Sequence, residues 1–387
     1  MNKLLSCWLL FIAISFLLPW EHRVYFLWDD IEFLMLYRNP SFLEFFLPHE
    51  YQVHPFFSFM YWLQIQLFGI NPSAFLIISA IFHILNIWLV YHLMKKITKS
   101  DFLSLLAAIL VSFNKSYFTI IYWPSMFSTV ILTTLLLLCS HLFMDIWKRF
   151  NSRKTILLFI TLVVASLTQG FGVGAGFLFA IAIFIFWKQS EKKYTLITAM
   201  SLAAILPLLI ILPVVTPEMK QDHIITFSLS RIFNFFYFIS VGVSQAIVSR
   251  FFLPGFVPNI YSKSNIVIMI ALPFTLFCYF ILAFMRMVRK KQTKRLMPIF
   301  LFGSFTIMPF VVAAIGRSRT GALAALAERN IYVPFFFFIL TLGYTTWLVN
   351  NRCPFSRLMQ IIIISIVIVL TIGHQYMLYT LLDQLFL

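Results

Sequence analysis

The chain has 387 residues, of which 61% are hydrophobic and only 11% are charged. A soluble domain carries about 25% charged residues, so this composition excludes a soluble protein and indicates one that lies in a membrane. The formal net charge of +16 would also suit a nucleic-acid-binding protein, but the basic residues fall in short connections between apolar segments. We therefore interpret the charge as a signal of membrane topology and expect no nucleic-acid partner.

Apolar segments recur along the whole chain, each close to the roughly 20 residues that a membrane-spanning helix needs. They cover residues 4–20, 74–94, 102–121, 122–147, 155–169, 170–187, 194–215, 265–285, 296–315, 331–349 and 358–380. We predict an all-α polytopic transmembrane bundle of about 11 helices, in which residues 1–387 form a single unit. A further apolar run at 232–248 is ambiguous, and we expect it to lie in, or dip into, the outer face.

Clusters of basic residues alternate with the predicted helices. They comprise Lys3; Lys95, Lys96 and Lys99; Lys148, Arg149, Arg153 and Lys154; Lys188, Lys192 and Lys193; Arg286, Arg289, Lys290, Lys291, Lys294 and Arg295; and Arg352 and Arg357. The positive-inside rule places such clusters in the cytoplasm, and all of them can lie there if an even number of crossings falls between residues 216 and 264. This predicts a cytoplasmic N-terminus, outer-face loops at 21–73, 216–264 and 316–330, and a multi-pass protein of the inner (plasma) membrane, in contact with membrane lipids.

The first outer loop contains the acids Asp29, Asp30 and Glu32 among aromatic and aliphatic residues. If this segment is helical, Asp29 and Glu32 share a face and Asp30 points elsewhere. A carboxylate held against aromatic side chains loses water, which raises its pKa and suits it to accept a proton. A carboxylate pair could instead hold a divalent cation such as Mg or Mn, or the acids could simply face water on an interfacial helix. The spacing does not decide among these.

The order of short motifs along residues 15–147 resembles that of a known enzyme superfamily. After the first helix come Asp29-Asp30, His54-Pro55, Phe68-Gly69-Ile70-Asn71-Pro72, a helix that contains His83 and Asn86, and Tyr122-Trp123-Pro124-Ser125. This order resembles the GT-C superfamily of polytopic glycosyltransferases, in particular the bacterial relatives of the protein-mannosyltransferase group (glycosyltransferase family 39-like). The later chain is similar to that family only in helix layout and in an Arg-containing outer loop.

The resemblance implies an inverting glycosyltransferase of the cell envelope. It would take a sugar from a polyprenyl-phosphate-linked donor and place it on a glycan, lipid or protein acceptor outside the cytoplasmic membrane, through an oxocarbenium-like state. Asp29 matches the family's first-loop acid, with Asp30 as its neighbour, so both are expected to be catalytic, with Asp29 as the base, and Glu32 is expected to contact substrate. His54 matches the His-Pro element and would orient the acid or meet the phosphate; alternatively it is a loop histidine before a turn-setting proline.

A second outer loop contains basic residues that suit a phosphate. Arginine binds phosphate in a bidentate manner, so we expect substrate binding by Arg317, Arg319, Arg329 and the nearby Tyr332. The relatives often show Arg-Tyr where this chain has Arg329-Asn330, and the arginines could instead contact lipid headgroups. Lys115 is a further candidate for the donor phosphate, although it could simply snorkel to the outer surface.

Two other functions remain open from the sequence. A transporter or flippase of a lipid-linked or small polar substrate would need polar residues at mid-membrane depth, where only His83, Asn86 and His141 stand out. We expect His83 and Asn86 to form a helix-packing hydrogen bond instead. An envelope-polysaccharide polymerase or ligase is the other alternative, but the early acid pair favours sugar transfer.

Overall fold

A computed structural model gives the structure of the chain. It describes residues 2–17, 26, 28–47, 53–112, 120–187, 190–211, 229–244, 293–317 and 330–350, with isolated residues between 278 and 289 and at 363. Within these residues every regular element is a helix and no strand occurs. The predicted all-α class is therefore confirmed.

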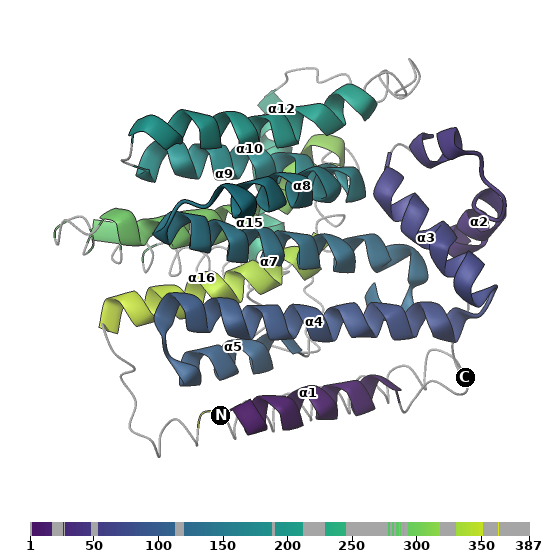
Figure 1. Ribbon diagram of the computed structural model, residues 1–387, viewed down its shortest axis with the longest axis horizontal. Coiled ribbons are helices and arrows are strands. Elements are labelled where there is room, and N and C mark those ends of the chain that lie inside the picture. The colour runs from purple at the N-terminus through teal and green to yellow at the C-terminus, as the bar shows by residue number, and fades with distance from the viewer. Residues whose placement is uncertain are drawn as a thin grey trace.

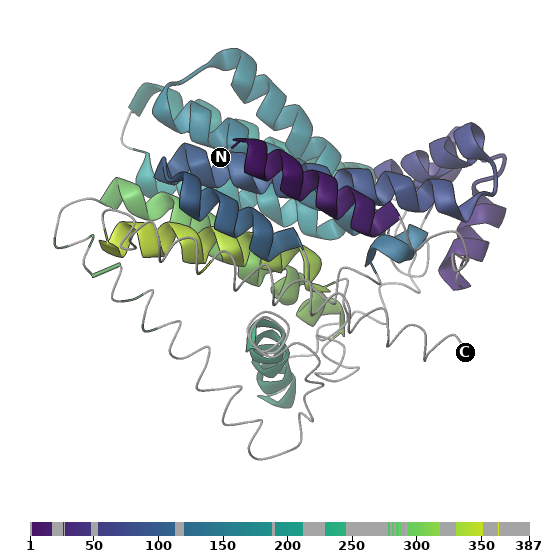
Figure 2. The same ribbon diagram turned by 90° about the horizontal axis from the view of Figure 1, so that it is seen from below.

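Most of the long helices run roughly parallel to one another along the long axis of the molecule (Figure 1). They are α1 (Asn2–Leu17), α4 (Pro72–Thr98), α5 (Asp101–Ser112), α7 (Phe127–Lys148), α8 (Ser152–Thr168), α9 (Gly170–Phe186), α10 (Ser190–Ile211), α15 (Met297–Arg317) and α16 (Tyr332–Asn350). The short helices η2 (Pro124–Met126) and η5 (Thr293–Leu296) lead into α7 and α15. Three more short helices gather at one end of the bundle: α2 (Trp28–Leu36), η1 (Phe42–Phe46) and α3 (Pro55–Phe68) (Figures 1 and 2).

Five helices of the described chain are long and apolar enough to cross a membrane. They cover Pro72–Thr98, Pro124–Lys148, Lys192–Ile211, Lys294–Ile315 and Tyr332–Val349. Shorter apolar helices, among them α5 and α9, accompany them, and together they identify a membrane protein. The predicted spans at 265–285 and 358–380 lie outside the described residues apart from isolated positions. The number of about 11 spans and the orientation in the membrane therefore remain predictions.

The sequence at the helix starts explains two of these boundaries. The Asn71 side chain accepts a hydrogen bond of 3.1 Å from the Ser73 N–H, and Pro72 occupies the first helical position of α4. Asn151 caps α8 in the same way, through the Lys154 N–H at 3.1 Å. Asparagine before a helix satisfies an N–H that has no partner inside it, and proline at the first position has no N–H to satisfy.

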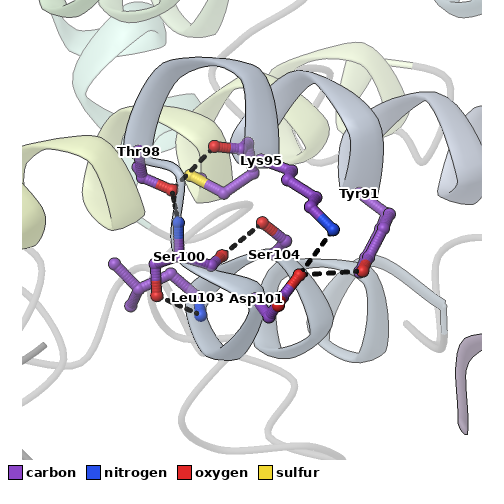
Figure 3. A network of polar contacts seen from close by, with 8 residues as sticks. Tyr91, Lys95, Thr98, Ser100, Asp101, Leu103 and Ser104 are labelled. Carbon is purple, nitrogen blue, oxygen red and sulfur yellow. Dashed lines mark hydrogen bonds and ion pairs between the residues drawn. The ribbon is translucent and has the colours of Figure 1, made fainter. Parts of the chain in front are cut away.

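The described basic clusters gather at the end of the bundle away from α2 and α3 (Figure 1). Lys96 on α4 and Lys154 on α8 both bind Asp145 on α7, at 2.9 and 2.7 Å. At the neighbouring turn between α4 and α5, Lys95 binds Asp101 at 2.7 Å (Figure 3). The helices thus bring basic connections that are far apart in the sequence to one side of the molecule, in agreement with the predicted alternation.

A buried polar network joins α4 to three other helices. His83 Nδ1 lies 2.7 Å from the Tyr332 hydroxyl, and His83 Nε2 lies 3.1 Å from the Ser112 carbonyl oxygen. Because a carbonyl only accepts, Nε2 donates to it and the Tyr332 hydroxyl donates to Nδ1. Asn86 donates to the Tyr332 oxygen at 3.3 Å and accepts from the Thr134 hydroxyl at 2.7 Å. The prediction that His83 and Asn86 form helix-packing hydrogen bonds is confirmed.

The segment with the ambiguous path contains α12 (Leu229–Val241). This helix has 13 residues, fewer than a membrane-spanning helix needs. Its Phe238 and Val241 form a small buried cluster with Ala314, in the C-terminal part of α15. Since α15 begins at the basic end, α12 packs on the half of α15 that is remote from the basic clusters. The crossings within 216–264 remain a prediction.

Candidate functional site

The short helix α2 carries the acid pair and has two different faces. Asp30 is 0% exposed, and Phe33 and Tyr37, three and seven positions further along, are buried with it. Asp29 is half-buried and Glu32 is exposed. The segment is therefore helical, and the prediction that Asp29 and Glu32 share a face while Asp30 points elsewhere is confirmed.

The Asp30 carboxylate caps a helix that lies far along the sequence. Its Oδ1 accepts a hydrogen bond of 2.7 Å from the backbone N–H of Ser125, 95 residues away. Ser125 belongs to η2, which continues into α7, and the preceding Trp123 makes no side-chain cap there. A carboxylate at a helix N-terminus satisfies an N–H that has no acceptor inside the helix and interacts favourably with the helix dipole. Asp30 therefore fixes α2 on the start of α7.

Aromatic rings of α3 pack on the buried face of α2. Phe33 contacts Phe57 and Tyr61, each with a ring-centroid distance of 5.4 Å. The Tyr61 hydroxyl donates a long hydrogen bond of 3.4 Å to the Asp30 carbonyl oxygen. Burial, with a further contribution from the Asp30 carboxylate, raises the pKa of Tyr61 far above its ordinary value. This hydroxyl therefore stays protonated and remains a donor, so α2 is held from two sides.

The helix α3 (Pro55–Phe68) lies within the segment predicted as the first outer loop and was not predicted as a helix. His54 is its N-cap residue, Pro55 occupies the first turn, and Gly69 ends it with a φ of 62°. Only glycine adopts that left-handed conformation without strain. Proline at the start of an apolar run that ends at glycine is the signal that could have revealed this helix. His54 lies edge-on to Phe57, with a ring-centroid distance of 6.5 Å, and so belongs to the same group of short helices as the acids; its role remains a prediction.

Asp29 and Asp30 do not present their carboxylates to a common ion. Adjacent positions of an α-helix project about 100° apart, and here one side chain is half-buried while the other is directed inward to Ser125. Among the residues that the structure describes, no three His, Cys, Asp or Glu side chains come together as metal ligands. The geometry fits a carboxylate that can accept a proton beside a carboxylate that positions the helix.

The other predicted site residues have different surroundings. Three of them lie outside the described residues: Lys115, Arg319 and Arg329. Arg317 is the last residue of α15, and the structure does not describe its side chain. Tyr332 is 0% exposed and bonds to His83 between α16 and α4. The structure thus gives Tyr332 a place in helix packing, and its contact with substrate remains a prediction.

Comparisons with known proteins identify the fold. No family model and no curated protein matches the sequence. Among solved structures, the chain is similar to the archaeal oligosaccharyltransferase AglB from Archaeoglobus fulgidus in complex with an inhibitory peptide and a dolichol-phosphate. The TM-score is 0.50 and the identity 13%, over 97% of this chain and 55% of that chain.

A second structure of the Archaeoglobus fulgidus oligosaccharyltransferase, tethered to an acceptor peptide that contains the NVT sequon, gives the same TM-score and identity over 97% of this chain and 54% of that one. The chain therefore spans about half the length of these two proteins. At 13% identity this similarity shows the fold alone, which the chain shares with the part of these oligosaccharyltransferases that it matches. The shared fold is consistent with the predicted GT-C superfamily, and the superfamily, glycosyltransferase family 39 and a bacterial source remain predictions.

Proposed function

We propose that the protein is a membrane glycosyltransferase of the GT-C type, which moves a sugar from a polyprenyl-phosphate donor to a glycan, lipid or protein acceptor. The observation that carries this proposal is the position of Asp29. It lies on a short helix directly after α1, in a GT-C fold, at the end of the bundle opposite the basic clusters. The positive-inside rule assigns the basic end to the cytoplasm, which leaves Asp29 at the outer membrane surface, where the phosphate of a lipid carrier lies.

In the proposed reaction Asp29 is the general base. The acceptor hydroxyl gives its proton to the Asp29 carboxylate while its oxygen forms a bond to the anomeric carbon. The bond between that carbon and the phosphate oxygen breaks, and polyprenyl phosphate leaves with the electron pair. A single displacement of this kind inverts the anomeric configuration. Asp30 takes no proton here, because its carboxylate holds α2 against Ser125.

The remaining predicted residues complete the proposal around this base. We assign His54 to orient the acid or to meet the leaving phosphate, and Glu32, exposed on the same face as Asp29, to contact substrate. The basic residues of the outer loops would bind the donor phosphate: Lys115, Arg317, Arg319 and Arg329. One similar structure contains a dolichol-phosphate and the other an acceptor peptide, which supports a lipid-linked donor and an acceptor of this general kind.

The polar residues at mid-membrane depth weigh against a transporter. His83 and Asn86 bond to neighbouring helices, as described above, and His141 Nε2 lies 2.9 Å from the Leu89 carbonyl oxygen of α4. Groups that are engaged in helix packing do not line a path for a polar substrate. Sugar transfer at the end of the bundle therefore fits the structure better than passage through it.

The test is a transfer assay with the purified full-length protein in lipid nanodiscs. Radiolabelled glucose, mannose, arabinose and N-acetylglucosamine, each carried on polyprenyl phosphate, are supplied with a crude envelope fraction as acceptor. We expect one donor to lose its label to the acceptor with release of polyprenyl phosphate. Failure of every donor to react with a folded protein, together with the absence of binding to any of them, would overturn the proposal.

A further inference from the structure

The start of α7 contains polar atoms that the packing of the described chain leaves unused. The Trp123 Nε1, the Ser125 Oγ and the Thr129 Oγ1 are buried and have no hydrogen-bond partner among the described residues. Ser125 is 5% exposed and Thr129 is 1% exposed. A buried polar atom without a partner is unfavourable and rare in native proteins, so three of them in one short segment require an explanation.

Other hydroxyl side chains of the helices show how such groups are normally satisfied. Thr133 and Ser140, also on α7, donate to the carbonyl four residues earlier at 2.9 and 2.8 Å. Thr306 on α15 and Thr341 on α16 do the same at 2.9 and 2.7 Å. This bond satisfies a hydroxyl in an apolar bundle without any partner from another helix. Thr129 does not make it, so its hydroxyl is available to a partner outside its own helix.

The unused atoms belong to the segment that binds Asp30, the acid that holds α2. Ser125 lies in η2, and Thr129 lies in the first turn of α7, which follows directly. The Ser125 N–H donates to the Asp30 carboxylate at 2.7 Å, which brings the Ser125 hydroxyl next to that carboxylate. Trp123 is the residue immediately before η2. One indole N–H and two hydroxyls without a partner therefore belong to the short segment of the chain on which Asp30 fixes α2, the helix that carries Asp29.

This set of groups suits a neutral, polyhydroxylated ligand. A phosphodiester has no proton to donate to the Asp30 carboxylate, which already accepts the N–H at the helix N-terminus. A sugar hydroxyl, in contrast, both donates to a carboxylate and accepts from an indole N–H or a hydroxyl. We infer that Trp123, Ser125 and Thr129 bind hydroxyl groups of a sugar ring next to Asp29. This inference rests on the proposed function and adds to it the subsite that recognises the sugar, of either the donor or the acceptor.

The test uses the double variant Ser125→Ala/Thr129→Val in the full-length protein. Both changes remove a hydroxyl and keep the backbone N–H that Asp30 binds. Since the lost hydroxyls have no partner, we expect the Tm of the double variant to stay unchanged or to rise. Thr133→Val is the matched control, because it removes a hydroxyl of the same helix that is bonded within that helix. A marked fall in Tm of the double variant relative to this control would show a packing role and overturn the inference.

Three probes then report on binding in nanodiscs: polyprenyl phosphate that carries one hexose, bare polyprenyl phosphate, and an octyl hexoside as an acceptor-type sugar. We expect the double variant to bind one sugar probe about tenfold more weakly than wild type, as the loss of two hydrogen bonds predicts, and the bare lipid equally well. Weakening confined to the lipid-linked hexose identifies the donor sugar, and weakening confined to the hexoside identifies the acceptor sugar.

Two negative results have different meanings. Wild-type protein that binds or transfers sugar, with a double variant that binds both sugar probes equally well, would overturn the subsite and leave the proposed function intact. Wild-type protein that neither binds a sugar probe nor transfers sugar would overturn the proposed function and the subsite together. Trp123→Phe, which keeps the ring and removes the N–H, is expected to weaken the same probe as the double variant.

Discussion

The two ends of the bundle use aspartates in different ways. At the basic end, Asp145 binds Lys96 and Lys154, and Asp101 binds Lys95, so these acids neutralise lysines and join helix ends (Figure 3). At the other end, the Asp30 carboxylate binds a backbone N–H at the start of α7, and Asp29 lies half-buried beside it. The acids among lysines join helix ends, whereas Asp30 fixes a short helix through a backbone N–H, and on that helix we propose that Asp29 acts as the base.

The largest effect is expected at Asp29. Asp29→Asn keeps the shape of a half-buried side chain and removes the base, so we expect the rate of sugar transfer to fall about 10²- to 10⁴-fold with little change in Tm. The measurement is the initial rate of transfer from the lipid-linked donor. Asp101→Asn, at the basic end, is the matched control and is expected to keep the wild-type rate. Normal transfer by the Asp29 variant would remove the proposed mechanism.

Two variants of Asp30 distinguish a positioning role of this residue from a catalytic one. Asp30→Ala leaves the Ser125 N–H without its acceptor, and we expect the free energy of unfolding to fall by about 1–3 kcal/mol, seen as a lower Tm. Asp30→Asn retains an acceptor oxygen, so it is expected to recover most of the stability and most of the transfer rate. An Asp30→Asn protein with wild-type Tm and no transfer would make Asp30 a catalytic residue and contradict the role given to it here.

A smaller effect is expected at the basic end. Asp145→Ala leaves Lys96 and Lys154 close together without their acid, but these side chains are partly exposed. Water and salt screen the interaction, so we expect a loss of about 1 kcal/mol or less in the free energy of unfolding, measured as a small, salt-dependent fall in Tm. The transfer rate is expected to stay at the wild-type value. A loss of transfer as large as that of the Asp29 variant would contradict the different roles given to the acids at the two ends of the bundle.

No effect is expected from removal of divalent cations. Asp29 and Asp30 project from different faces of α2, so they do not hold one ion between them. Treatment of the purified protein with EDTA should therefore leave the transfer rate unchanged, and added Mg or Mn should not raise it. A rate that is lost with EDTA and restored by either metal would show that the acid pair acts as a metal site, the alternative that the spacing of the acids left open.

The long helices could be predicted from the sequence because a membrane-spanning helix is recognised by the apolar residues of its own segment. Apolar length predicts α4, α7, α10, α15 and α16 without any knowledge of their neighbours. The faces of α2 followed from helical spacing in the same way. The helix α3 was missed because its 14 residues are too few for a membrane span and were therefore interpreted as part of a loop. Its capping residues, His54-Pro55 and Gly69, were the available signal.

The contacts within the candidate site could not be predicted, because they join residues that are distant in the sequence. Asp30 meets Ser125 across 95 residues, and Tyr332 meets His83 across 249. The periodic pattern of apolar residues does not indicate which distant residues come into contact. A buried aspartate and a half-buried aspartate at adjacent positions look alike in the sequence, and only the tertiary contact of Asp30 with Ser125 distinguishes them.

The most direct test of the central claim is the sidedness of the two ends. Asn39, just after α2, and Arg153, at the start of α8, are both exposed. Each is replaced by cysteine in a variant whose four native cysteines are changed to serine, and intact cells are treated with a membrane-impermeant maleimide. We predict labelling of Asn39→Cys in intact cells and of Arg153→Cys only after the membrane is permeabilised. The reverse pattern would place the acids in the cytoplasm and contradict sugar transfer at the outer face.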